Sequence, residues 1–241
     1  MQINRVAGAF VFGLLVHVAC AASAASLTLV TEDYPPFSMQ KAGSSDVVGI
    51  ATDLLRGAMK KAEIDYTVSL FPWKRAYESA LKDADTCVYS TTRTEEREPL
   101  FKWIGPLIHN DWVLFGRTDS PKLASLDDAK AYRVGGYQGS ANTLYLESQG
   151  FKVDEAVADR LNPKKLMANR IDFWTSGAIL GPYLASREGA AGIIPILKFK
   201  DVEMDLACNK SVPDDVIVRL NAAIKQMMND RSMETINKAY Q

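Results

Sequence analysis

Few side chains in this 241-residue sequence could carry out covalent or metal chemistry. His17 and His109 stand apart, and neither is spaced with a serine or cysteine and an acid as a nucleophilic triad would require. Cys87 and Cys208 lie far apart in the chain, without the close pairs of a zinc site or a redox motif. We therefore predict no catalytic residues, no metal site and no cofactor.

Two other features could recognise an anion. The string Gln138-Gly139-Ser140 ends a predicted strand and opens a helix, where backbone amides and the Ser140 hydroxyl can donate hydrogen bonds. Such a turn also needs glycine for backbone geometry alone. Arg97 offers a planar guanidinium that can hold a carboxylate through two hydrogen bonds. It lies among three glutamates, so from the charge pattern alone a solvated charge at a helix start is the simpler interpretation.

Strand and helix patterns alternate along the chain and must position these residues. Apolar β-rich runs predict strands at 27–31, 66–71, 86–90, 112–117, 133–137, 171–175, 193–199 and 205–209. Apolar residues at helical spacing predict helices at 50–62, 73–81, 141–148 and from Pro213 onward. Strand–helix–strand alternation favours parallel sheets covered by helices, which bind ligands at the carboxyl ends of their strands.

The composition excludes some classes of function. With 28 basic and 29 acidic residues the formal charge is −1, which argues against a generally basic nucleic-acid binder. Hydrophobic residues make up 47% of the chain, enough for a packed core.

Residues 1–25 have the features of a cleaved secretory signal. Arg5 precedes an apolar run over 6–19, and the small residues Ala22-Ser23-Ala24 fit a cleavage site. The run is shorter than the ~20 residues that cross a membrane. Export places Cys87 and Cys208 in an oxidising compartment, where either a structural disulfide or two buried thiols would fit; we expect the disulfide.

Three strings give the mature chain a recognisable pattern. They are Tyr34-Pro35-Pro36-Phe37, the run Gly49-Ile50-Ala51-Thr52-Asp53-Leu54-Leu55, and Thr92-Arg93-Thr94-Glu95-Glu96-Arg97. In this order they resemble bacterial periplasmic solute-binding proteins of the polar amino-acid type, family 3. The resemblance implies an α/β fold of two lobes joined by two crossover strands (type 2). Residues 26–117 and 203–241 would form lobe 1, and residues 118–202 lobe 2.

The resemblance also assigns roles to individual residues. Arg97 falls on the arginine that grips the ligand carboxylate, and Ser90 and Thr92 fall on the supporting hydroxyls. Tyr34 falls on the aromatic residue that packs over the ligand. Trp73, at the start of the next helix, is expected to face the same loop end, where either contact with the ligand or core packing would fit. Gly139 and Ser140 correspond to the second clamp on the carboxylate, and Asn142 would either reach the ligand or cap the helix locally.

Gly177 departs from the family pattern. Amino-acid-binding members carry an acidic residue for the ligand's ammonium a few positions after a string matched here by Asn169-Arg170-Ile171-Asp172. A buried ammonium without a charge partner is costly. Either Glu32, Asp33 or Asp111 compensates, or the ligand is not an ordinary α-amino acid.

We therefore expect a monomeric periplasmic protein that binds a small polar carboxylate, passes it to an inner-membrane ABC permease and contacts no nucleic acid. Two alternatives stay open: a ligand-sensing partner of a membrane receptor, and a dehydratase-like enzyme on the same scaffold. An enzyme would need a positioned acid or base in the cleft, and the sequence shows no such set.

Overall fold

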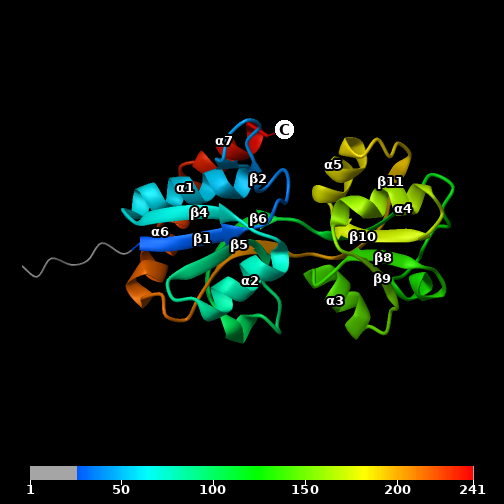
Figure 1. Cartoon of the computed structure of the whole chain (residues 1–241), viewed down its shortest axis with the longest axis horizontal. Helices are drawn as coiled ribbons and strands as arrows, with labels where there is room; N and C mark the ends of the chain where they lie inside the picture. Colours follow the sequence, from blue (N-terminus) through cyan, green and yellow to red (C-terminus); the bar gives the residue numbers. More distant parts are fainter. Residues whose placement is uncertain (1–25, 241) are drawn as a thin grey trace, which may run out of the picture.

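Two five-stranded sheets organise residues 26–240, the part of the chain that the computed structural model describes (Figure 1). Each sheet forms the centre of one α/β lobe, and the two lobes lie side by side. The signal segment predicted for residues 1–25 lies outside the described residues. Within residues 26–240, no helix has the length and apolar character needed to cross a membrane.

The first lobe is built on a sheet of strand order β4-β1-β5-β12-β6. Its strands are β1 (Ser26–Thr31), β4 (Asp65–Leu70), β5 (Thr86–Thr92), β6 (Lys102–His109) and β12 (Glu203–Cys208). Strand β1 pairs in parallel with β4 and β5, whereas β12 runs antiparallel to β5 and β6. The short strands β2 (Met39–Gln40) and β3 (Val47–Val48) form a separate pair.

Helices cover both faces of this sheet. On one face α1 (Ile50–Ala62) and α6 (Asp214–Asn229) pack over Leu27 and Leu29, with α7 (Ser232–Lys238) outside them. On the other face α2 (Trp73–Lys82) packs over Val30 and Val88. The predicted apolar stripe of α1 is buried, because its members recur every three or four residues and therefore share one side of the helix.

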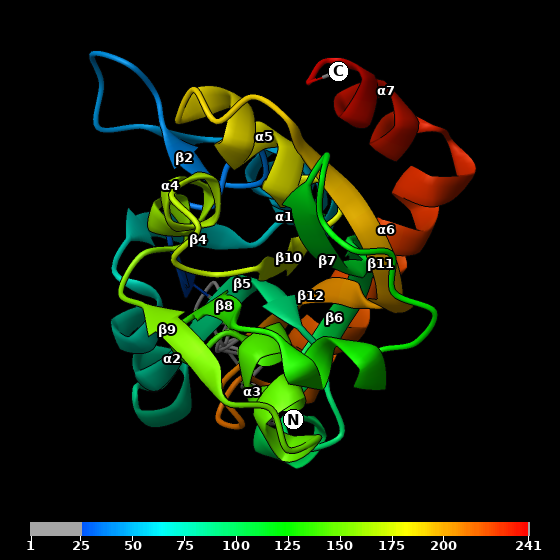
Figure 2. The ribbon, with the colours of Figure 1, turned by 90° about the vertical axis from the view of Figure 1, so that its right-hand side faces the viewer.

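The second lobe has the strand order β11-β7-β10-β8-β9. Its strands are β7 (Trp112–Arg117), β8 (Val134–Tyr137), β9 (Val153–Ala156), β10 (Phe173–Gly177) and β11 (Ile193–Lys200). Its helices are α3 (Ala141–Ser148), α4 (Asn162–Met167) and α5 (Leu180–Arg187), and Figure 2 shows α5 and α3 on opposite sides of the sheet. Three 3-10 turns complete the elements: η1 (Glu98–Leu100), η2 (Asp127–Ala131) and η3 (Asp159–Leu161).

The lobe boundary expected after residue 117 needs correction. Strand β7 pairs antiparallel with β10 and β11, so it belongs to the second sheet. The chain therefore first crosses between lobes at 110–111, before β7, and it returns at 201–202, between β11 and β12. An apolar run predicts a strand, but the strands with which it pairs depend on tertiary packing. The sequence alone therefore did not assign β7 to the correct lobe.

The expected disulfide between Cys87 and Cys208 is confirmed in the structure, with an S–S distance of 2.09 Å. The two residues are direct neighbours on β5 and β12. Because β12 follows the return crossing, the covalent loop of 121 residues encloses the whole second lobe.

Candidate functional site

A cavity of about 620 Å³ lies between the lobes. Glu32 and Tyr34, which follow β1, line it from the first lobe, together with Phe71 after β4. Tyr137 at the end of β8 and Asp159 after β9 line it from the second lobe. The carboxyl ends of the parallel strands of both sheets thus meet at one place, as such sheets favour for ligand binding.

A second cavity of about 580 Å³ also has walls from both lobes. Trp73, Tyr77 and Arg97 contribute from the first lobe, and Gly139 and Tyr145 from the second. The indole Nε1 of Trp73 donates a hydrogen bond to the carbonyl oxygen of Gly139 across the gap, at 3.1 Å. Pro72, which precedes Trp73, and Tyr137, at the end of β8, border the first cavity.

Arg97 is buried between aromatic rings, with 7% of its surface exposed. Its guanidinium carbon lies 5.4 Å from the ring centre of Trp73 and 5.1 Å from that of Tyr77. Its Nη1 donates to the carbonyl oxygen of Thr92 at 3.2 Å. The interpretation of Arg97 as a solvated surface charge is therefore wrong.

The charge on Arg97 lacks an ionic partner within residues 26–240. None of the ion pairs formed there includes Arg97, although three glutamates surround it in sequence. Those glutamates are exposed, and Glu98 pairs with Arg93 instead. Burial lowers the pKa of Arg97. Glu95 and Glu96 also border the second cavity, with exposed side chains, but neither forms an ion pair with Arg97. A buried guanidinium that borders a cavity and has no ion pair within residues 26–240 is suited to hold a carboxylate of a ligand.

Ser90 and Thr92 lie farther from the cavities than the resemblance implies. Neither residue borders either interlobe cavity. Ser90 has a φ of 58° and its hydroxyl lies 3.5 Å from that of Ser38. Thr92 is buried and holds Arg97 through its backbone carbonyl. In this arrangement Thr92 orients the arginine through its main chain.

Tyr34 contacts both lobes. Its ring packs against the core cluster of the first lobe and also against the cluster of the second lobe that contains Trp174. The Nδ2 of Asn110, on the first crossing, donates to the Tyr34 hydroxyl at 3.5 Å. Phe37 lies 5.6 Å away, ring to ring, and is fully buried. Tyr34 therefore faces the cavity, and Phe37 supports it from the core.

The start of α3 presents only one of its three expected residues to a cavity. The Ser140 hydroxyl caps the helix by accepting from the Thr143 amide, and it donates to Asn142 Oδ1 at 2.6 Å. Asn142 is buried, and its Nδ2 donates to Thr175 at 3.1 Å. Gly139 borders the second cavity, and its carbonyl already accepts from the indole of the first lobe.

Gly177 has no space for the acid that the family pattern would place there. A Cβ on Gly177 would overlap the side-chain amide of Asn110. That amide is itself held in place, because its Oδ1 accepts from the backbone N–H of Ile179 at 3.2 Å. Asn110 thus occupies the volume that a carboxylate would need.

Among the three compensating acids suggested by the sequence, Glu32 and Asp33 line the first interlobe cavity, and Asp111 does not. The Tyr137 hydroxyl of the second lobe donates to Glu32 Oε2 at 2.9 Å. Burial raises the pKa of Glu32 to about 8. Asp33 is exposed at the border of the same cavity. Asp111 lies on the crossing and pairs with Lys198.

Asp159 is a cavity acid that the sequence reasoning missed. Its Oδ1 accepts from Asn162 Nδ2 at 3.0 Å and from Trp174 Nε1 at 2.8 Å, and its Oδ2 accepts from Ser176 Oγ at 3.0 Å. Burial raises its pKa. In the sequence it begins Asp159-Arg160-Leu161-Asn162-Pro163, where an acid in a first helical turn is ordinary.

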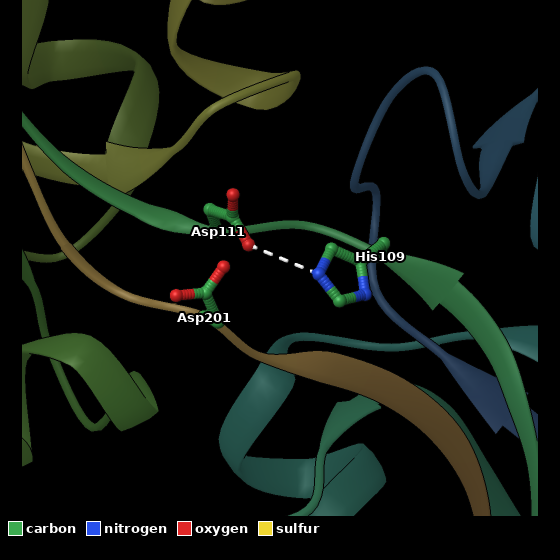
Figure 3. A group of neighbouring side chains, drawn as sticks. All are labelled: His109, Asp111 and Asp201. Carbon is green, nitrogen blue, oxygen red and sulfur yellow. Dashed lines mark ion pairs between the residues drawn. The ribbon is translucent and has the colours of Figure 1, made fainter.

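The two crossings carry a separate group of polar side chains (Figure 3). His109 Nε2 lies 3.3 Å from Asp111 Oδ1, and ligand atoms of His109, Asp111 and Asp201 lie within 4.8 Å of one another. Lys198 contacts the carboxylates of both aspartates. Because this ammonium already pairs with both carboxylates, we assign the group to joining the crossings and not to metal binding.

Comparisons with known proteins agree with this architecture. The family model for bacterial extracellular solute-binding proteins, family 3, matches residues 27–241. No curated protein sequence matches the chain. The expected two-lobed α/β fold of periplasmic binding proteins is confirmed by similar solved structures, which have 15–19% sequence identity to this chain.

One similar structure is a histidine kinase sensor domain with similarity to periplasmic binding proteins, at 15% identity and a TM-score of 0.83, covering 90% of this chain and 96% of that one. Another is the arginine-, lysine-, histidine-binding protein ArtJ of Geobacillus stearothermophilus, at 17% identity and a TM-score of 0.78, covering 89% of this chain and 94% of that one. A third is an ancestral arginine-binding protein bound to glutamine, at 19% identity and a TM-score of 0.77, covering 90% of this chain and 98% of that one. At these identities the similarity establishes the fold.

Proposed function

Because this chain belongs to family 3 of the bacterial extracellular solute-binding proteins, we propose that it captures a small polar solute with a carboxylate group between its two lobes. Amino acids and related compounds are the class of solute in view. The proposal requires no bond to be made or broken in the ligand, in keeping with a family of binding proteins.

The observation that carries the proposal is the environment of Arg97. A guanidinium that is 7% exposed and has no acidic partner within residues 26–240 is a costly arrangement by itself. A ligand carboxylate would supply the missing charge, and a planar guanidinium can hold it through two hydrogen bonds. The rings of Trp73 and Tyr77 lie beside the guanidinium and limit its freedom before a ligand binds, which reduces the entropy lost on binding.

Closure of the lobes would complete the site. Tyr34 already packs against both cores, and the indole of Trp73 contacts Gly139 of the opposite lobe. A ligand bound first to Arg97 on the first lobe would thus be covered by the start of α3 on the second. Hinge closure around a ligand is a common switching motion, and the crossings at 110–111 and 201–202 are its natural hinges.

We further propose that the protein acts in the periplasm and delivers its ligand to an inner-membrane ABC permease. A role as the ligand-sensing partner of a membrane receptor is the second candidate. The fold similarity to a histidine kinase sensor domain favours keeping it. Both roles use the same event, because the partner distinguishes the closed form from the open one.

The test compares ligands that differ only in the carboxylate. Purified protein is titrated calorimetrically with L-amino acids, starting with arginine, lysine, histidine and glutamine, and with their α-carboxamides. We expect at least one amino acid to bind and its amide to bind at least thirtyfold more weakly, since loss of one side of a buried charge pair costs about 2–5 kcal/mol. Equal affinity for acid and amide, or no binding of any carboxylate, would contradict the proposal.

A further inference from the structure

A second cation, Lys200, borders the same cavity as Arg97 but comes from the opposite lobe. Arg97 lies in the loop after β5, and Lys200 is the last residue of β11. Both line the second interlobe cavity, of about 580 Å³. Among the described residues that line it, only these two are basic. The cavity therefore has one positive charge on each wall.

Lys200 is seated on aromatic rings, as Arg97 is. Its Nζ lies 4.1 Å from the ring centre of Tyr145 and 5.5 Å from that of Trp112. The two ring centres are themselves 5.5 Å apart. A ring face attracts a cation but carries no net charge. Each lobe thus presents a cation on a pair of rings, and in neither case do the rings neutralise the positive charge.

The ammonium of Lys200 has no ionic partner within residues 26–240. None of the ion pairs formed there includes it, although Lys198 on the same strand pairs with Asp111 and Asp201. Lys200 is half-buried, and a charge partly withdrawn from water interacts more strongly with an anion than a fully solvated one does. Lys198 therefore joins the crossings, whereas the charge of Lys200 is available to the cavity.

Two acids at the rim of the cavity do not remove this charge. Glu95 and Glu96 are exposed, and neither forms an ion pair with Arg97 or Lys200 in the described part of the chain. A hydrogen bond from Thr94 lowers the pKa of Glu96, and the charges of Lys200 and Arg97 lower it further. Both cations thus act on one side chain, which shows that they lie near the same part of the rim. Water screens the exposed carboxylates more than the groups on the walls.

We propose that Lys200 binds a second anionic group of the ligand, so that the ligand is a dicarboxylate with one carboxylate on Arg97 and the other on Lys200. The proposal rests on the proposed function, because Arg97 holds the first carboxylate in both. It deepens that function by naming a ligand class with two negative charges. Lys200 is not among the residues to which the family resemblance gives a role.

The walls between the two cations indicate the chemistry of the ligand's body. Tyr77 and Leu100 line the cavity from the first lobe, and Leu144 and Tyr145 line it from the second. The two leucines are 42% and 49% exposed, which leaves apolar surface for a ligand to cover. Methylene groups or an aromatic ring between two carboxylates would match this distribution of charge and apolar surface.

The test compares ligands that differ only in the second carboxylate. Succinate, glutarate, adipate, isophthalate and glutamate are each titrated calorimetrically into the protein beside the corresponding monoamide, which for glutamate is glutamine. We expect at least one dicarboxylate to bind at least about tenfold more tightly than its monoamide, because hydrogen bonds to charged groups contribute more than those between neutral groups. No such preference for any member of the series would overturn the proposal.

Variants of Lys200 locate the effect. Lys200→Met removes the charge, and it should reduce the preference for the dicarboxylate to less than about twofold while leaving the affinity for the monoamide nearly unchanged. Lys200→Arg keeps the charge and should keep the preference, which separates charge from packing against Tyr145. Lys152→Met is the matched control, because Lys152 is an exposed lysine of the second lobe that borders neither interlobe cavity. An equal preference in Lys200→Met and Lys152→Met would overturn the assignment to Lys200.

The outcomes separate this proposal from the one that it deepens. Arg97-dependent binding of carboxylates, without any gain from a second carboxylate, would overturn the role of Lys200 and leave the proposed function standing. Equal affinity for an amino acid and its α-carboxamide would overturn the proposed function and this inference with it.

Discussion

The indole Nε1 of Trp73, in the first lobe, donates a 3.1 Å hydrogen bond to the carbonyl oxygen of Gly139 in the second. Together with the bond from Tyr137 to Glu32, it joins the two lobes directly across their interface. The same indole covers the guanidinium of Arg97. One side chain therefore links the arrangement of the lobes to the group that we expect to hold the ligand.

Substitution of Trp73 by phenylalanine should favour the open arrangement. The change removes the interlobe donor and keeps an aromatic ring beside Arg97. Because a single net hydrogen bond contributes about 0.5–1.5 kcal/mol, ligand affinity should fall by a few-fold to about tenfold. The radius of gyration of the ligand-free protein, from small-angle X-ray scattering, should increase. Trp103→Phe is the matched control, since its indole donates to Glu98 within the first lobe; equal effects of both variants would contradict the prediction.

The Arg97 guanidinium should strengthen ligand binding and lower the free energy of unfolding of the ligand-free protein. Arg97→Lys should lose at least thirtyfold in affinity for a carboxylate ligand, because a point charge does not reproduce a two-pronged contact. Arg97→Met should abolish binding while leaving the free energy of unfolding unchanged or raised, since it removes a buried charge that has no acidic partner. Calorimetric titration and urea unfolding measure the two effects. A strong loss of stability in Arg97→Met would indicate a structural role for the charge.

An acid should not be tolerated at Gly177 while Asn110 is present. The new side chain would overlap the Asn110 amide, and overpacking of this kind costs about 1–3 kcal/mol. Gly177→Asp should therefore lower the urea midpoint, and Gly177→Asp combined with Asn110→Gly should recover most of the loss. If the double variant is no more stable than the single one, the overlap is not the cause.

The Cys87–Cys208 bridge should stabilise the protein mainly by restricting the unfolded chain. For a loop of 121 residues, the chain-entropy model gives roughly 4–5 kcal/mol. The double variant Cys87→Ala/Cys208→Ala should unfold at correspondingly lower urea concentration. Thiol titration of the denatured, unreduced protein with the signal segment removed should find no free thiol, and two reactive thiols would refute the bridge.

Glu32 should make the ligand-free protein less stable as the pH rises. Its pKa is raised by burial to about 8 in the folded state, against 4.5 for the ordinary group. The folded state therefore binds the extra proton between these values, and stability falls as pH increases from about 4.5 to about 8, by at most about 1.4 kcal/mol per pH unit. Asp205, whose pKa burial raises to about 6, adds a similar slope at lower pH. The difference in unfolding free energy between the protein and Glu32→Gln isolates the contribution of Glu32, and a pH-independent difference would contradict it.

The local elements of this fold were readable from the sequence. The helical spacing of Ile50, Leu54 and Met59 determines which side of α1 is buried, because a helix repeats every 3.6 residues whatever it packs against. Most of the apolar strands likewise follow from local patterns, whereas β6, β9, α4 and α5 were not predicted from the sequence. Family-specific strings then place Tyr34 in the loop after β1 and Arg97 in the loop after β5.

Other features depended on contacts between distant segments. Strand β7 joins the second sheet only because β10 and β11 are there to pair with it. Asp159 enters the cavity because Trp174 and Ser176 of β10 hold its carboxylate, and nothing local distinguishes it from an acid at an ordinary helix start. The exclusion of an acid at Gly177 depends on Asn110, 67 positions earlier by their numbering.

The sequence by itself determined most of the elements, the family and the types of charge available to a ligand, because these depend on spacing and residue type. The tertiary structure decided which charges are buried without partners, because burial and ion pairing are properties of neighbours brought together by folding. Arg97 shows the difference most clearly. Three nearby glutamates in the sequence suggest a solvated surface charge, yet folding buries the guanidinium beside Trp73 and Tyr77.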